Sequence, residues 1–191
     1  MLEKFVLFLH KKHGITPNIL SYIRIFSAPF LALFISQILL NKNLTLTIIT
    51  LILYILIVST NLVKTIFNNS IPKTKNYDHF HEEILGNLSN KVLIIFLLIP
   101  FGLNLFTFFI ISAELILVFQ DLYSPSNKKQ KKYIEKTKII LQILLIPILI
   151  LQIVTNFVPE MIIYTYIIIT IIYTYISVYS NYSHYFYFEN K

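Results

Sequence analysis

The sequence predicts an all-α integral membrane protein, a bundle of six transmembrane helices preceded by a short amphipathic helix. Of the 191 residues, 56% are hydrophobic and 13% are charged, whereas soluble proteins carry about 25% charged residues. The mean hydropathy is +0.71. Six apolar runs approach the ~20 residues that a helix needs to cross a bilayer. We therefore expect a single membrane domain over residues 1–191.

Each expected element has a physical reason. Residues 1–14 carry charges on both sides of a short apolar stretch, which favours an amphipathic helix on the membrane surface. The six spans are expected at residues 18–40, 44–63, 86–103, 105–123, 139–157 and 160–180.

Polar and helix-breaking residues separate the spans. The turn Asn41-Lys42-Asn43 follows the first span, and Pro100, Gly102 and Asn104 divide the third from the fourth. Asn156 with Pro159-Glu160 divides the last two. Two longer polar segments remain, at 64–85 and 124–138.

Charge predicts the orientation. The chain has 16 Lys and Arg against nine Asp and Glu, a net charge of +7. In a six-span layout nearly all lysines fall on one side and Lys42 falls opposite, so both termini and both polar segments are expected on the cytoplasmic face of an inner or cytoplasmic membrane. Concentrated positive charge in such a chain favours lipid headgroups or phosphate-bearing substrates over nucleic acid. The lack of Cys excludes disulfides and thiolate metal sites.

Two clear cases of an ionisable residue well inside an expected span are Arg24 and Glu114, and each costs about 2.5–3.5 kcal/mol on insertion scales. Arg24 lies about two turns into the first span and either faces the bundle interior, to contact a phosphate or carboxylate, or extends to the headgroups. Glu114 lies near the middle of the fourth span. It either forms an ion pair with Arg24 or a lysine, or orients a polar site.

Three stretches resemble the CDP-alcohol phosphatidyltransferases. ITPNILSYIRIFSAP at 15–29 is similar to the opening of the first helix of that family, and NKVLIIF at 90–96 resembles the segment around its last catalytic aspartate. IEKTKIILQ at 134–142 is similar to a G-K-x-K-T-x-x-Q stretch of the phosphatidylglycerophosphate synthase branch. The resemblance covers most of the chain, and it implies transfer of a phosphatidyl group from CDP-diacylglycerol to glycerol 3-phosphate, with release of CMP.

The family motif reads D-x-x-D-G-x-x-A-R-x8-G-x-x-x-D-x-x-x-D, and its four aspartates hold two divalent cations, Mg²⁺ or Mn²⁺. When Lys91 is used as the anchor, the motif positions are occupied by Asn61, Lys64, Thr65, Asn69, Glu82, Gly86 and Asn90. None of these replaces an aspartate with a carboxylate. The alternative that keeps the eight-residue spacing places Asp78 at the motif Gly, and Glu82 and Gly86 at the last two aspartates. An Arg-Glu pair of the synthase branch is reduced to Ala113-Glu114.

Two polar segments offer other candidates. Asp78, His79, His81, Glu82 and Glu83 form either a metal-binding cluster or a solvated loop. The basic segment 128–138 anchors the protein to anionic lipid, and it also offers Lys136 and Lys138, with Arg24 and Lys91, as contacts for a substrate phosphate.

Two functions remain open at this stage. The chain is either a diverged but active phosphatidyltransferase that uses Mg²⁺ or Mn²⁺, CDP-diacylglycerol and glycerol 3-phosphate, or an inactive homologue. An inactive homologue would bind lipid or nucleotide in the bilayer as a homodimer or as the partner of an active synthase. A small transporter has little support, because no helix pair interrupted by Gly is present.

Overall fold

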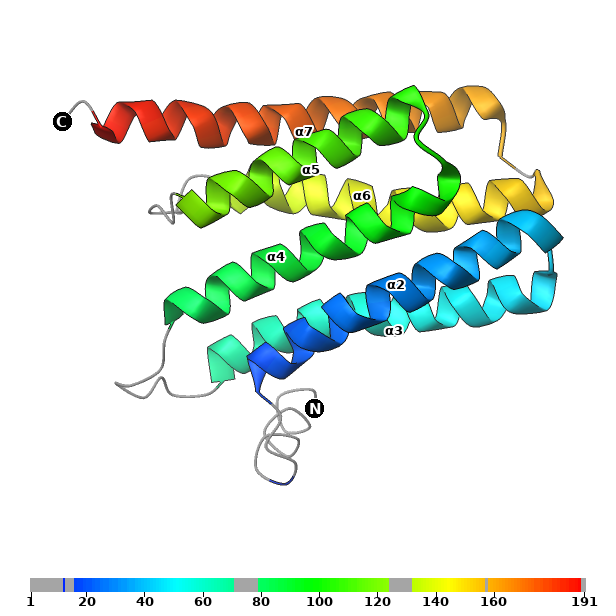
Figure 1. Cartoon of the computed structure of the whole chain (residues 1–191), viewed down its shortest axis with the longest axis horizontal. Coiled ribbons are helices and arrows are strands. Elements are labelled where there is room, and N and C mark those ends of the chain that lie inside the picture. Colours follow the sequence, from blue (N-terminus) through cyan, green and yellow to red (C-terminus); the bar gives the residue numbers. More distant parts are fainter. Residues whose placement is uncertain (1–11, 13–15, 71–78, 124–131, 157, 190–191) are drawn as a thin grey trace.

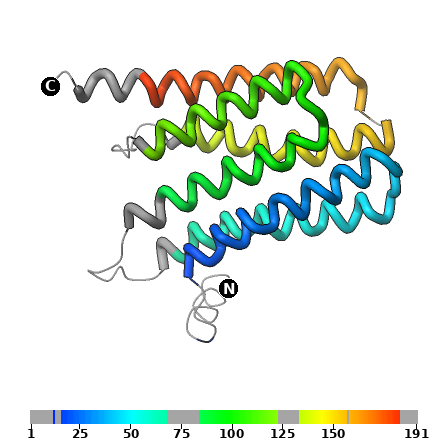
Figure 2. The backbone as a smooth tube through the Cα atoms, in the orientation of Figure 1, coloured from blue at the N-terminus to red at the C-terminus, as the bar shows by residue number. Residues whose placement is uncertain are grey.

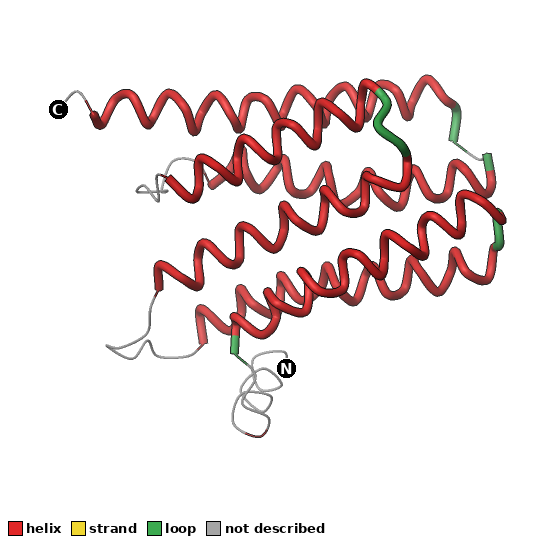
Figure 3. The backbone as a smooth tube through the Cα atoms, in the orientation of Figure 1, coloured by secondary structure: helices red, strands yellow, loops and turns green. Residues whose placement is uncertain are grey.

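The computed structural model describes residues 12, 16–70, 79–123, 132–156 and 158–189, with side chains described outside 68–70, 79–83, 123, 132 and 183–189. The described residues form helices and short turns without a strand (Figure 3). The amphipathic helix expected at 1–14 lies outside the described residues, apart from Lys12.

Each of the six expected spans coincides with a helix that is long and apolar enough to cross a membrane. A 3-10 turn, η1 (Ile99–Phe101), follows the third of them. The helices are α2 (Pro17–Asn41), α3 (Leu44–Ser70), α4 (His79–Leu98), α5 (Leu105–Tyr123), α6 (Lys132–Thr155) and α7 (Glu160–Glu189).

Polar side chains cap several helix starts. The hydroxyl of Thr16 accepts a hydrogen bond from Ile19 N at the start of α2, directly before Pro17. Asn43 and Asn104 cap α3 and α5, where each side chain accepts two backbone N–H bonds of 2.9–3.2 Å. Because these caps satisfy backbone groups that a helix start leaves unpaired, they fix where each span begins.

The bundle consists of two three-helix groups (Figures 1 and 2). In the first group α3 and α4 both pack on α2, and in the second α5 and α6 both pack on α7. The η1 turn joins α4 to α5, and Gly102 follows it with a φ of 82°, a conformation that favours glycine. Many of the large apolar side chains on the outside of the bundle are exposed, as expected for helices in contact with lipid.

Parts of the two polar segments expected at 64–85 and 124–138 are helical rather than loops. Helix α3 continues through 64–70, α4 already begins at His79, and α6 begins at Lys132. Figure 1 shows the start of α2, the end of α7 and the helix ends that flank both polar segments at one end of the bundle. Lys42 lies in the turn at the opposite end from the helix ends that carry Lys64, Lys132 and Lys136, so these described lysines have the asymmetry that the sequence predicts.

Candidate functional site

Arg24 is directed into the bundle. The residue is 0% exposed, so the interpretation in which it extends to the headgroups is wrong. Its Nη1 donates to Asn90 Oδ1 on α4 at 2.5 Å, and makes a longer contact of 3.4 Å with Asn61 Oδ1 on α3. Its Nε and Nη2 are buried and have no hydrogen-bond partner among the described residues. Three N–H groups of the guanidinium, one on Nε and two on Nη2, are therefore unpartnered among the described residues.

These residues line a cavity between the two helix groups. Its empty space, open solvent at the mouth included, is about 490 Å³. Each of the six candidate membrane-spanning helices except α7 contributes to the lining, which includes Arg24, Asn61, Asn90, Glu114 and Lys138. Residues from five helices thus meet in one place, near the end of the bundle where α6 begins and α3 ends.

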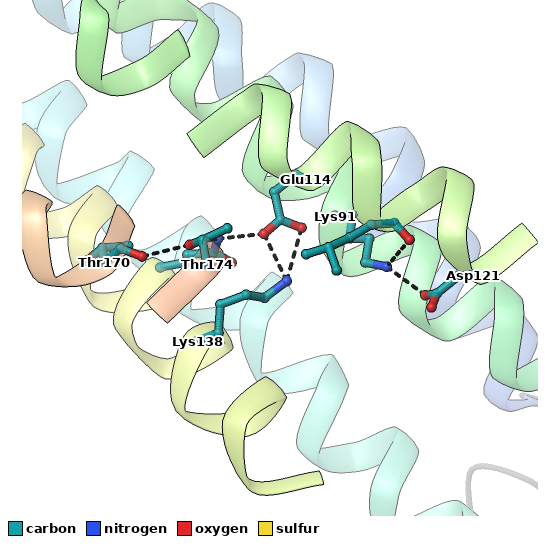
Figure 4. A network of polar contacts seen from close by, with 8 residues as sticks. Lys91, Glu114, Asp121, Lys138, Thr170 and Thr174 are labelled. Carbon is teal, nitrogen blue, oxygen red and sulfur yellow. Dashed lines mark hydrogen bonds and ion pairs between the residues drawn. The ribbon is translucent and has the colours of Figure 1, made fainter. Parts of the chain in front are cut away.

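Glu114 forms an ion pair with Lys138 inside the second group, which decides between its possible partners (Figure 4). Lys138 Nζ lies 2.9 and 3.2 Å from the two carboxylate oxygens, and both residues are at most 2% exposed. Gln142 Nε2 donates to Glu114 Oε1 at 2.6 Å and contacts Thr174 Oγ1 on α7 at 3.3 Å. Helices α5, α6 and α7 are therefore joined by one buried polar network.

Lys91 also has a carboxylate partner. Its ammonium lies 2.6 Å from Asp121 Oδ2 and donates to the Leu117 carbonyl at 2.9 Å, so both acceptors lie on α5 (Figure 4). Lys91 and Lys138 line the cavity with their charges already balanced. Arg24 has no carboxylate within ion-pair distance among the described residues, which distinguishes it from both lysines.

The remaining positions aligned with the family motif are not among the residues that line the cavity. Lys64 is buried, and its Nζ donates to Ser21 Oγ on α2 at 3.0 Å. The same ammonium lies over Gly86, where an added Cβ would overlap it. Thr65 is exposed, with its hydroxyl bonded to the Asn61 carbonyl. The side chains of Asn69 and Glu82 lie outside the described residues.

The aligned positions do not fit a pair of divalent cations. The oxygens of Asn61 and Asn90 already accept bonds from the Arg24 guanidinium, and the Lys64 ammonium occupies the space beside Gly86. A divalent ion needs anionic oxygen ligands to balance its charge. These residues present two amides and two cations.

Other candidates are only partly resolved by the structure. No group of three His, Asp or Glu side chains is placed to hold a metal within the described part of the chain. Asp78 and the side chains of His79, His81, Glu82 and Glu83 lie outside that part, although the backbone of 79–83 is helical rather than a loop. Lys136 is exposed and away from the cavity, whereas Lys138 lines it.

Four site residues were missed by sequence reasoning. Asn87 and Glu135 line the cavity, Gln142 bonds Glu114, and Asp121 balances Lys91. Asp121 carried a usable signal, since it is an ionisable residue inside an expected span, as is Lys91, and such residues need partners.

Comparisons with known proteins give no match: no protein-family model, curated protein or solved structure matches the chain.

Proposed function

We propose that the chain is a membrane-embedded homologue of the CDP-alcohol phosphatidyltransferases that binds CDP-diacylglycerol without transferring its phosphatidyl group. One observation carries the proposal. Arg24, Asn61 and Asn90, which the resemblance aligns with the first helix and the motif of that family, converge on one cavity although 37 and 66 residues separate the two asparagines from Arg24. The resemblance requires these positions to meet around the substrate.

The same residues argue against the transfer reaction. A lysine ~4 Å from a divalent ion would repel it by roughly 8 kcal/mol at an effective dielectric of ~20. Lys64 stands at one aspartate position, and the asparagines at two others have no proton-accepting carboxylate to activate an alcohol. Binding therefore fits the described residues better than catalysis does.

The setting fits a lipid ligand. The cavity is surrounded by helices that are long enough to span a bilayer, and it lies toward the lysine-rich end of the bundle. We place this end on the cytoplasmic face of an inner or cytoplasmic membrane, because short loops on that side carry an excess of Lys and Arg. The proposed partner is an active synthase. The chain would either supply the lipid nucleotide to that synthase or withhold it.

The test uses the whole chain in phosphatidylcholine nanodiscs, with an active phosphatidylglycerophosphate synthase as the positive control. Retention of CDP-diacylglycerol is measured by native mass spectrometry, and CMP release is measured with glycerol 3-phosphate and either Mg²⁺ or Mn²⁺. We expect retention of the lipid and no CMP release. CMP release above the empty-nanodisc background would identify an active transferase instead, and failure to retain the lipid would contradict the proposal.

A further design asks whether the motif can be restored. An aspartate at Gly86 would meet the ammonium of Lys64, which is the far end of a flexible side chain and can move aside. We therefore expect Gly86→Asp alone to be accommodated as an ion pair with Lys64, whereas Lys64→Asp with Gly86→Asp should lower thermal stability because two like charges then lie close together. Transferase activity would require aspartate at Asn61 and Asn90 as well, together with the motif Gly and Arg.

A further inference from the structure

The free edge of Arg24 is the feature that the described residues leave unexplained. A buried cation without a counter-charge is costly, since desolvation of an ion is offset only by good partners. Arg24 donates one short and one long hydrogen bond to the oxygens of neutral amides, and its Nε and Nη2 donate none among the described residues. Nε and Nη2 lie on the same edge of the planar guanidinium, the arrangement that binds two oxygens of one oxyanion.

The surroundings add donors rather than acceptors. The Oδ1 atoms of Asn61 and Asn90 face Arg24, so the remaining polar group of each amide is an N–H donor. Asn87 on α4 lines the same cavity. The charged lining comprises three cations and two carboxylates, Glu114 and Glu135, and Glu114 is already bonded to Lys138.

We propose that the Nε–Nη2 edge of Arg24 binds a phosphate oxyanion directly, without a divalent cation. This inference rests on the proposed function, since it names the group of the ligand that the cavity holds and the residue that holds it. The shared chemistry is a phosphate monoester or diester. A phospholipid headgroup and a soluble nucleotide are its two sources.

Two variants separate this site from a cation site. Arg24→Lys keeps the charge but loses the two-donor edge, so affinity for phosphate should fall at least about tenfold, the loss of one charge-assisted hydrogen bond. Asn90→Asp places a carboxylate against the guanidinium and should lower phosphate affinity by a similar factor of about ten while raising thermal stability. If the cavity were a divalent site, Asn90→Asp would instead create Mn²⁺-dependent binding. Lys136→Gln, at an exposed lysine outside the cavity, is the control variant.

The experiment uses the full chain in nanodiscs with EDTA, and a second series replaces EDTA by Mn²⁺ to detect metal-dependent binding by Asn90→Asp. One arm measures retention of phosphatidic acid by native mass spectrometry, and the other measures CMP binding by calorimetry. We expect the wild type and Lys136→Gln to bind at least one probe, and Arg24→Lys and Asn90→Asp to bind it about tenfold more weakly. Binding of phosphatidic acid alone identifies a lipid source, and binding of CMP alone a nucleotide source.

Two results would overturn the inference: no binding of either probe in EDTA, or unchanged binding in both cavity variants. A parallel measurement with CDP-diacylglycerol keeps the two proposals distinguishable. Retention of that lipid only with added Mg²⁺ would overturn direct phosphate binding and leave the proposed function standing. Binding of phosphatidic acid or CMP in EDTA without any retention of CDP-diacylglycerol would do the reverse.

Discussion

Arg24 Nη1 donates a 2.5 Å hydrogen bond to the amide oxygen of Asn90, across the contact between α2 and α4. The bond joins a charged donor to a neutral acceptor, at the position where the resembling family carries its last aspartate. It is the shortest contact that the guanidinium makes. What the cavity can bind therefore depends on this bond and on the unpartnered Nε and Nη2 donors beside it.

The two asparagines should contribute unequally to stability. Asn90→Ala removes the 2.5 Å bond and leaves Arg24 with the 3.4 Å contact to Asn61, so we expect a loss of about 1.5–3 kcal/mol, the range for a hydrogen bond to a charged group. Asn61→Ala should cost less than half as much. Equilibrium unfolding in mixed detergent micelles measures both, and equal losses would contradict the geometry.

The Glu114–Lys138 pair should be coupled. Glu114→Gln or Lys138→Met alone leaves a buried charge without its partner, and each should lower the free energy of unfolding by about 3–5 kcal/mol. The double variant should be closer to the wild type than the sum of the two losses. Lys136→Met, at an exposed lysine two residues away, should stay within about 0.5 kcal/mol as the control. Additive losses in the cycle would show that the two charges do not interact.

A tyrosine compensates for a proline in α6. Pro147 has no N–H, so it cannot bond the carbonyl of Ile143 one turn earlier, and the hydroxyl of Tyr54 on α3 donates to that oxygen at 2.6 Å. Tyr54→Phe should therefore cost about 1–3 kcal/mol, the penalty of a buried carbonyl without a partner. In a Pro147→Ala background, where the backbone N–H returns, the same change should cost less than half of that.

The control for this pair is Tyr22→Phe, at a tyrosine that is 46% exposed. It should leave unfolding within about 0.5 kcal/mol of the wild type. An equal cost of Tyr54→Phe with proline or alanine at position 147 would mean that the hydroxyl does not serve the freed carbonyl.

Glu135 should weaken anion binding. Its carboxylate lines the same cavity from the first turn of α6, and no ion pair is recorded for it among the described residues. Glu135→Gln should raise affinity for phosphatidic acid or CMP in EDTA by about three- to tenfold, the effect of removing one like charge at high effective dielectric. Glu160→Gln, at the start of α7 and the opposite end of the bundle, should change nothing. Weaker binding by Glu135→Gln would assign the carboxylate a different role.

The positions of the spans could be predicted from the sequence, whereas the lengths of several helices could not. Runs of about 20 apolar residues and the Asn and Pro breaks mark where helices cross hydrocarbon. Hydropathy measures burial in lipid, so it treats polar helical turns such as 64–70 and 132–138 as loops, although the backbone hydrogen bonding continues there. For this reason the sequence prediction did not assign the polar ends of α3 and α6 to helices.

The site could be predicted in part for a related reason. Arg24 and Glu114 were identifiable because charge inside a span needs an explanation, and Lys138 because it lies in the basic segment that resembles the synthase branch. Their pairing depends on how each helix is rotated about its axis, and 24 residues separate the partners Glu114 and Lys138. Sequence spacing therefore left Arg24 and the lysines as equal candidates for Glu114, and the packing of α5 against its neighbours decided for Lys138.

In the proposed site, phosphate contacts Arg24 directly rather than through a metal. The most direct measurement is the affinity of the wild-type chain for CDP-diacylglycerol in nanodiscs, compared in EDTA and in millimolar Mg²⁺. If Arg24 binds the phosphate directly, the affinities for CDP-diacylglycerol in EDTA and in Mg²⁺ should agree within about twofold, because Mg²⁺ then contributes no contact to the complex. Binding that disappears in EDTA and returns with Mg²⁺ would contradict the account.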